Sequence, residues 1–234
     1  YENKTGKDSF TYVAIDSAGN TSPEAKVTVQ IDKPDTKVDY ADLDGSPAHK
    51  AALRLAEEGI FVGEYRNGQY FFDPDQTVSR AEFLSLAMAA AGLEPMEDVT
   101  VTGFSDDAAI PTWAKAYAAA GVADGIIQGV STAEGVAFQG DEPITFNEAA
   151  TVLNRVLAVE DVDLASWYAD REAVPSWAAQ AVGNMEALNV LRVGSFGSDS
   201  LETAVTRADA ARMLSAAGTL LRGEEPSGLL GWLK

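Results

Sequence analysis

Apolar and polar side chains alternate with a period of two over residues 25–31, which predicts a β-strand. A second β-rich run covers residues 10–15. The segment 16–20 between the two runs, Asp-Ser-Ala-Gly-Asn, has the composition of a turn. We therefore predict a β-hairpin over residues 1–34, followed by a polar linker over residues 35–39.

From residue 40 onward the chain is rich in alanine, and its apolar positions follow the period of a helix. One succession of features occurs three times: an aromatic-x-Asp triplet, a first helix, a loop and the start of a second helix. Ser and Thr suit the N-cap of a helix, whereas Gly and Asn tolerate the left-handed conformation after its end. The predicted N-caps of the first helices are Ser46, Thr112 and Ser176, and these helices are predicted to end at Gly59, Gly125 and Asn189.

The second helix of each repeat begins with Ser or Thr, followed three residues later by Glu or Asp. In such a capping box the two side chains satisfy free backbone N–H groups at the helix start. Gly63 precedes Arg80 by 17 positions, and Gly129 precedes Phe146 by the same 17. This internal repeat predicts a mainly α fold of three helix-loop-helix modules after the hairpin. The capping pairs are Ser79 with Glu82, Thr145 with Glu148, and Thr206 with Asp209.

The 234 residues carry a formal net charge of −19, from 17 Lys or Arg and 36 Asp or Glu. Binding to nucleic acid is not expected, because phosphate contacts need clustered basic side chains. No stretch approaches 18 consecutive apolar residues, so membrane insertion is not expected either. Cysteine is absent, which excludes disulfides, thiol nucleophiles and cysteine-ligated metals.

The succession of aromatic-x-Asp, Trp-Ala, Gly-Ile/Val with a further Gly, Phe-x-Pro and Thr-Arg-Ala-Glu resembles the S-layer homology (SLH) module. Residues 72–83 and 104–129 resemble it most closely. The resemblance implies a pseudo-threefold bundle with ligand grooves between neighbouring modules. It also implies a secreted protein of the bacterial cell surface, held to the cell wall without a covalent bond by binding cell-wall polysaccharide. The implied modules cover residues 40–93, 94–158 and 159–222.

The two ends of the chain differ from these repeats. The N-terminal hairpin bears a weaker resemblance to the last two strands of an Ig-like or cadherin-like surface domain, cut off at its start. Residues 223–234 form a tail whose apolar side chains are expected to pack on the domain or to contact another subunit. Self-association suits an alternative function, a structural module that makes protein–protein contacts in a surface lattice. Neither function requires catalysis, and no enzyme is expected.

Arg80 and Arg207 occupy the first helical position after their capping residues, where the helix dipole mildly disfavours a cation. A guanidinium beside free N–H groups forms a site for a carboxylate or a phosphate, and the resemblance implies such a role for this arginine. Ion pairs with neighbouring acids are the alternative. Phe146 and Asn147 replace Arg and Ala in the second repeat, so we expect at most two of the three grooves to bind.

Trp113 and Trp177 stand at the starts of the first helices of repeats two and three, where repeat one has Pro47. An indole face can stack on a sugar ring, but it can equally cover the core. Both tryptophans are candidate glycan-binding residues. The remaining candidates have helix capping as their alternative role, and they are Ser79, Glu82, Thr206 and Asp209.

The acidic charge also bears on the ligand. Long-range repulsion slows the encounter of an acidic module with an anionic polymer. A neutral glycan, or one that carries amines, would therefore fit better. Binding that strengthens with added salt would instead indicate an anionic ligand.

No cofactor is expected. Residues 42–46 (Asp-Leu-Asp-Gly-Ser) resemble the start of a calcium loop, and Asp73 and Asp75 are spaced in a similar way. Leu53 occupies the position where such a loop needs a bidentate glutamate, so calcium is kept only as a minor alternative. His49 is the single histidine, and without a Gly-x-Ser-x-Gly motif neither a hydrolase triad nor a zinc site is expected.

Overall fold

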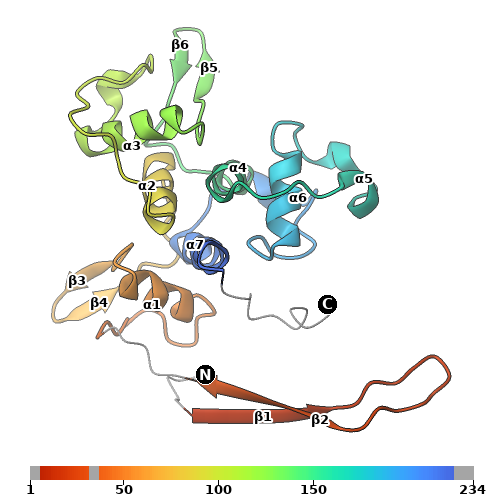
Figure 1. Ribbon diagram of the computed structural model, residues 1–234. Coiled ribbons are helices and arrows are strands. Elements are labelled where there is room, and N and C mark those ends of the chain that lie inside the picture. The colour runs from red at the N-terminus through yellow and green to blue at the C-terminus, as the bar shows by residue number, and fades with distance from the viewer. Residues whose placement is uncertain (1–5, 32–36, 224–234) are drawn as a thin grey trace.

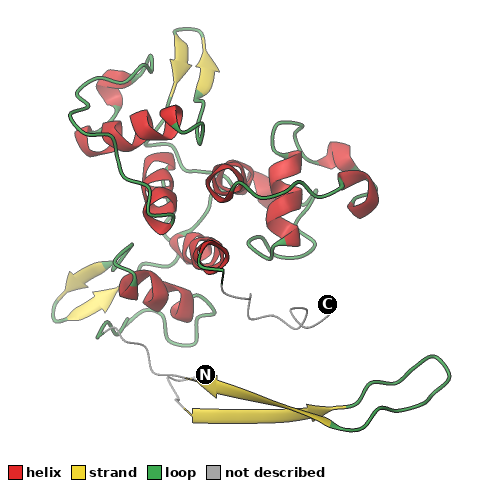
Figure 2. Cartoon of the chain, in the orientation of Figure 1, coloured by secondary structure: helices red, strands yellow, loops and turns green. Residues whose placement is uncertain are grey.

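The computed structural model describes residues 6–31 and 37–223, and helices dominate it (Figures 1 and 2). The predicted mainly helical fold class is confirmed, whereas the predicted tail from residue 224 onward lies outside the described residues. The α-helices are α1 (His49–Glu57), α2 (Arg80–Ala90), α3 (Thr112–Ala123), α4 (Phe146–Leu157), α5 (Leu164–Trp167), α6 (Ala179–Ala187) and α7 (Arg207–Leu221). Short 3-10 turns cover Asp107–Ala109, Arg171–Ala173 and Asp199–Glu202.

The described strands form three antiparallel hairpins. β1 (Gly6–Tyr12) pairs with β2 (Ala25–Ile31), with Tyr12 opposite Ala25. β1 therefore begins before the predicted run and ends earlier, and the Asp16 carboxylate caps the turn by accepting N–H bonds from Ala18 and Asn20. The other hairpins join β3 (Glu64–Arg66) to β4 (Gln69–Phe71) and β5 (Val130–Thr132) to β6 (Gly135–Ala137).

Helices α2, α4 and α7 contact one another in the middle of the helical part, and the remaining helices surround them (Figure 1). Each first helix packs on the second helix of a different repeat: α3 on α2, α6 on α4 and α1 on α7. The contact of α1 with α7 joins the first and last of the described α-helices, so the arrangement closes on itself. The predicted pseudo-threefold symmetry of this arrangement stays a prediction.

Three backbone hydrogen bonds form a closed ring where the segments before the central helices meet. The N–H of Val78 donates to the carbonyl of Val205 (2.9 Å), Val205 donates to Ile144 (2.8 Å), and Ile144 donates to Val78 (3.0 Å). All three side chains are buried, so water cannot replace these partners and each bond is costly to lose. The ring fixes the starting points of α2, α4 and α7 relative to one another.

The second helices begin as predicted. The side chains of Ser79, Thr145 and Thr206 each accept a hydrogen bond from the backbone N–H three residues later. In α2 and α4 the glutamate at that position completes the capping box by accepting the N–H of the capping residue. Local sequence chemistry therefore determines where these helices start.

The first helices end as predicted but begin differently. Gly59, Gly125 and Asn189 have positive φ angles of 70°, 71° and 58°, which confirms the left-handed position after each helix. None of the first helices has a side-chain hydrogen bond at its N-cap, because Ala and Pro occupy these positions and have no side-chain acceptor. In α1 the Ser46 hydroxyl accepts the N–H of Ala48 in the turn before the helix. The N-caps predicted at Ser46, Thr112 and Ser176 are therefore wrong, and the N-cap positions are Ala48, Pro111 and Ala178.

Position 63 requires glycine, both because of its backbone angle and because of the atoms around it. Its φ is +76°, and an added Cβ would overlap the carbonyl oxygen of Phe71. We expect Gly63→Ala to lower the free energy of unfolding by about 3 kcal/mol, from backbone strain and overlap together. Gly59→Ala is the matched control, because φ is +70° there and no atom lies within 4 Å of the added Cβ.

Urea denaturation of both glycine variants checks this prediction. The free energy of unfolding of Gly59→Ala should fall by only about 1 kcal/mol, because only the left-handed backbone conformation is strained there. Equal losses in the two variants would contradict the role assigned to the Phe71 carbonyl.

The Asp107 carboxylate links the segment before α3 to the helix, because it bonds both Thr102 and Lys115. Lys115 lies 2.7 Å from Oδ2, and Thr102 donates to Oδ1 through its N–H and hydroxyl. The hydrogen bond from Lys115, followed by those from Thr102, lowers the pKa of Asp107 from 3.8 to about 2. A lowered folded-state pKa stabilises the fold above the unfolded pKa, and this stabilisation is lost as the pH falls through the folded pKa.

We therefore expect Asp107→Asn to be less stable than the wild type at pH 7. The difference should disappear between pH 3.8 and about 2, the two pKa values that bracket the window. Thermal unfolding of both proteins across this range measures it. A difference that persists unchanged at pH 2 would overturn the assignment.

Candidate functional site

A groove of about 390 Å³ lies along α2 and α4, and we call it the Arg80 groove. Its apolar lining comes from both helices and from the segment after α3. Its polar lining combines two arginines with a glutamate, an amide and a hydroxyl, and an indole from the start of the α6 region completes it. The lining residues are Arg80, Leu84, Ile126, Ile127, Gln128, Gly129, Val130, Phe138, Ile144, Glu148, Thr151, Val152, Arg155 and Trp177.

Arg80 lies in this groove as part of an ion pair. Its Nη1 contacts the Glu148 carboxylate, its Nε donates to the Phe138 carbonyl at 3.1 Å, and its side chain is only 13% exposed. The second oxygen of Glu148 accepts the N–H of Thr145 at 2.9 Å. One carboxylate therefore completes the capping box of α4 and neutralises the first residue of α2.

The backbone N–H groups at the start of α2 all have partners. Arg80 donates to the Glu142 carbonyl and Ala81 donates to the Gly140 carbonyl, both at 2.9 Å. The N–H of Glu82 donates to the Ser79 hydroxyl at 3.2 Å. The expectation that free N–H groups stand beside this arginine is wrong, because the neighbouring repeat supplies carbonyl oxygens for them.

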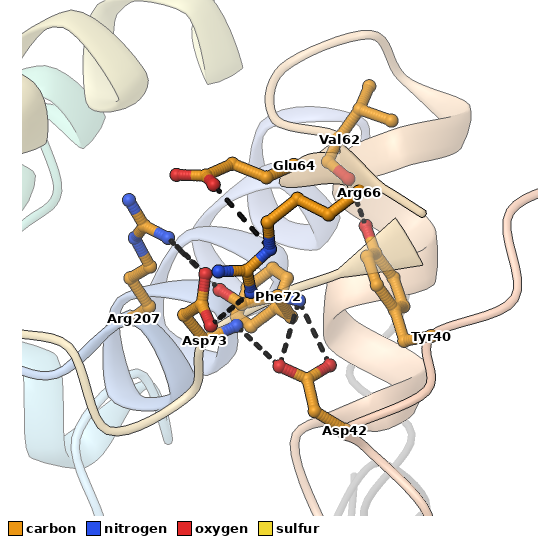
Figure 3. Close-up of polar contacts among 8 residues, drawn as sticks. All are labelled: Tyr40, Asp42, Val62, Glu64, Arg66, Phe72, Asp73 and Arg207. Atoms are coloured by element: carbon orange, nitrogen blue, oxygen red, sulfur yellow. Dashed lines mark hydrogen bonds and ion pairs between the residues drawn. The ribbon is translucent and has the colours of Figure 1, made fainter. Parts of the chain in front are cut away.

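A smaller pocket of about 160 Å³, the Arg207 pocket, lies where α1, α2 and α7 meet. Arg207 donates to the Phe72 carbonyl at 3.3 Å and lies 3.6 Å from the Asp73 carboxylate (Figure 3). The other oxygen of Asp73 lies 2.7 Å from Arg66. Apart from Arg207, the residues that line the Arg207 pocket are mainly apolar. They are Leu55, Phe61, Phe72, Val78, Glu82, Ser85, Leu86, Ala210, Ala211 and Leu214.

Asp42, from the first aromatic-x-Asp triplet, has a structural role. Its carboxylate accepts the backbone N–H of Phe72 and of Asp73, the latter at 2.7 Å (Figure 3). Asp106 in the second repeat accepts the N–H groups of Phe138 and Gln139 in the same way. Within residues 6–31 and 37–223, no group of three or more His, Cys, Asp or Glu side chains is placed to hold a metal ion.

The two candidate tryptophans occupy different surroundings. Trp177 is 58% exposed and lines the Arg80 groove, from a turn just before α6. Trp113 is the second residue of α3, is 49% exposed and lines neither the Arg80 groove nor the Arg207 pocket. The structure thus brings Trp177 together with Arg80, but not Trp113 with either arginine.

The remaining candidates are engaged in helix capping or in packing. The Thr206 hydroxyl accepts a hydrogen bond from the backbone N–H of Asp209 and donates one to the Asp209 carboxylate. Ser79 and Glu82 form the capping box of α2. Their binding of a glycan stays a prediction.

In the second repeat Phe146 packs against the core, and the buried Asn147 side chain donates to Glu202 at 2.7 Å.

Arg155 is a groove residue that sequence reasoning missed. It lies near the end of α4 and donates from Nη1 to the Ile126 carbonyl at 3.0 Å. The sequence does indicate that Arg155 lies on the same helix face as Glu148, because Glu148, Thr151 and Arg155 are spaced by three and four residues. Such residues share one face of a helix.

The Arg80–Glu148 pair should contribute to stability as a unit. We expect Arg80→Met to lower the free energy of unfolding by about 2 kcal/mol, since a half-buried carboxylate loses its cation. A double-mutant cycle with Glu148→Gln, followed by urea denaturation, should give a coupling energy above roughly 0.5 kcal/mol. Arg212 and Asp209, an exposed pair at 3.4 Å, provide the control cycle, in which the coupling should be near zero. Additive effects at Arg80 and Glu148 would contradict the pairing.

Comparison with known proteins finds matches for the first two of the three repeats. The S-layer homology domain model matches residues 39–84 and 103–150. A relative, the Surface-layer 125 kDa protein of Lysinibacillus sphaericus, is 34% identical over 131 residues, which cover 56% of this chain. The chain spans only 10% of that relative's length.

Together these matches indicate a secreted, cell-surface protein. None of the helices in the described part of the chain is long and apolar enough to cross a membrane. Residues 39–84 and 103–150, which together make up less than half of the chain, are therefore similar to S-layer homology domains.

Proposed function

We propose that this chain anchors a secreted bacterial protein to the cell envelope by binding a cell-wall polysaccharide in the Arg80 groove, without catalysing a reaction. The observation that carries the proposal is the position of Trp177, an exposed indole at the edge of a groove that also holds polar side chains. An exposed large aromatic side chain costs free energy unless a partner covers it, which favours a binding role over a role in the core.

The chemistry of the groove suits a sugar. A pyranose ring has apolar faces that stack on an indole, and hydroxyl groups at its edge that need hydrogen-bond partners. The groove offers Trp177 for the ring face, and Gln128 and Thr151 as neutral hydrogen-bonding groups. A few placed polar groups above an apolar floor are typical of small-molecule sites.

The three inter-repeat sites are proposed to differ in function. In the pseudo-threefold arrangement the Arg207 pocket is the counterpart of the Arg80 groove, because each holds the first residue of a central helix. Its smaller volume favours weaker binding or none. Phe146 takes the third such position, so that site lacks the arginine altogether. The Arg80 groove is therefore the principal site.

A lattice function is the second candidate, because the relative is named as a surface-layer protein. In that case the repeats would contact other protein subunits rather than a glycan. Binding to cell walls freed of protein separates the two functions, because a lattice module has no partner there.

Co-sedimentation with protein-free cell-wall sacculi tests the anchor. The wild-type chain should pellet, and Trp177→Ala should bind about tenfold more weakly because the sugar loses its stacking surface. Trp167→Ala is the matched control, since Trp167 is 66% exposed but lies outside the groove.

The possible outcomes separate the proposals. A wild-type chain that stays in solution would refute the anchor and favour the lattice function. Equal losses in the two tryptophan variants would keep the anchor but remove the groove as its site.

A further inference from the structure

We infer that apolar side chains of residues 229–233 fill the Arg207 pocket of the same chain. This segment, Leu-Leu-Gly-Trp-Leu, belongs to the tail that lies outside the described residues. The inference concerns a pocket other than the Arg80 groove and an occupant other than a glycan, so it does not depend on the proposed function.

The walls of the Arg207 pocket favour an apolar occupant. Eight of the eleven residues that line it are apolar. Two of them, Phe61 and Leu86, are only half-buried, so part of this apolar surface faces water. Removing such surface from water is favourable.

The polar side chains of the lining already have partners inside the protein. The Ser85 hydroxyl donates to the Glu82 carbonyl at 2.8 Å, and the Glu82 carboxylate accepts the N–H of Ser79 at 2.8 Å. Arg207 donates to the Phe72 carbonyl at 3.3 Å. A sugar hydroxyl that entered the pocket would lose its water partners and find few replacements, which is unfavourable.

The size of the pocket suits one apolar side chain. Its volume is about 160 Å³. An apolar cavity of about 150 Å³ in another protein holds a benzene molecule. A leucine side chain or a six-membered aromatic ring therefore has room here, whereas a stretch of several sugar rings does not.

An ion pair holds the end of α7 beside one wall of the pocket. Arg222, the C-cap residue of α7, lies 2.9 Å from the carboxylate of Glu58, the C-cap residue of α1. Leu55, one turn earlier in α1, lines the pocket. The tail therefore leaves α7 next to the helix that carries this wall.

The backbone turns where the tail begins. Gly223 has a φ of +65°, and its N–H donates to the Leu220 carbonyl at 3.0 Å. A left-handed residue at this position ends a helix and redirects the chain, and Pro226 cannot continue the helix. The chain therefore departs from the axis of α7 immediately after Arg222.

The tail is long enough to reach the pocket. Leu214 lines the pocket nine residues before Gly223, which corresponds to about 14 Å along the helix axis. Leu229 follows Gly223 by six residues, and six extended residues span about 20 Å. The apolar side chains from Leu229 onward therefore come within reach of the pocket.

Disulfide cross-linking of the full chain tests the inference, and the absence of native cysteine makes each introduced pair unambiguous. One variant combines Ser85→Cys in the pocket with Leu230→Cys in the tail, and a second replaces Leu230→Cys by Leu233→Cys. The control pairs the same tail cysteines with Ser131→Cys, an exposed residue of β5. Under mild oxidation of dilute protein, at least one pocket pair should form an intrachain disulfide about ten times faster than its control, because docking raises the effective concentration.

Thermal unfolding supplies a second measurement. Leu229→Ser, Leu230→Ser and Leu233→Ser together should lower the unfolding midpoint of the full chain by about 4 °C, because the pocket loses its apolar occupant. The Ala211→Leu background is the matched control, because its larger side chain takes up part of the pocket. In that background the three tail substitutions should lower the midpoint by clearly less.

The outcomes that contradict the inference are distinct. If neither pocket pair cross-links faster than its control, the tail does not occupy the pocket. If disulfides form only between two chains, the occupant comes from a second copy and the inference is wrong. Equal midpoint losses with and without Ala211→Leu would place the tail elsewhere, and in each of these cases binding to cell walls would be unaffected.

Discussion

A closed ring of three backbone hydrogen bonds, linking Val78, Val205 and Ile144, is the constraint on which the helical part depends. Each residue directly precedes the N-cap of a central helix, so the ring determines how α2, α4 and α7 approach one another. The ring also joins segments that are more than 60 residues apart in the sequence. It cannot form within one repeat, and the central helices therefore need partners from the other repeats.

The candidate site follows from this dependence between repeats. Because the start of each central helix lies against its neighbour, Arg80 on α2 meets Glu148 on α4. The same contact supplies carbonyl oxygens to the N–H groups that would otherwise attract an anion. The helix start is thus satisfied within the protein, and the surface left for a ligand moves along α4 toward Thr151 and Arg155.

Small differences between the repeats give the inter-repeat sites different properties. The Arg207 pocket is smaller than the Arg80 groove, and Phe146 replaces the arginine at the third site. A single groove with an exposed indole is consistent with an anchor that depends on one principal contact per chain.

The sequence by itself determined the repeat, the helical class, the capping residues of α2, α4 and α7, and the left-handed positions at Gly59, Gly125 and Asn189. These features depend on neighbours within a few residues, so local chemistry specifies them. Only the tertiary structure decided that Glu148 would pair with Arg80 and that Trp177 would join the groove. The first joins residues 68 positions apart, and Trp177 lines the groove from 97 positions beyond Arg80. They arise from the closure of the central helices, which no local pattern encodes.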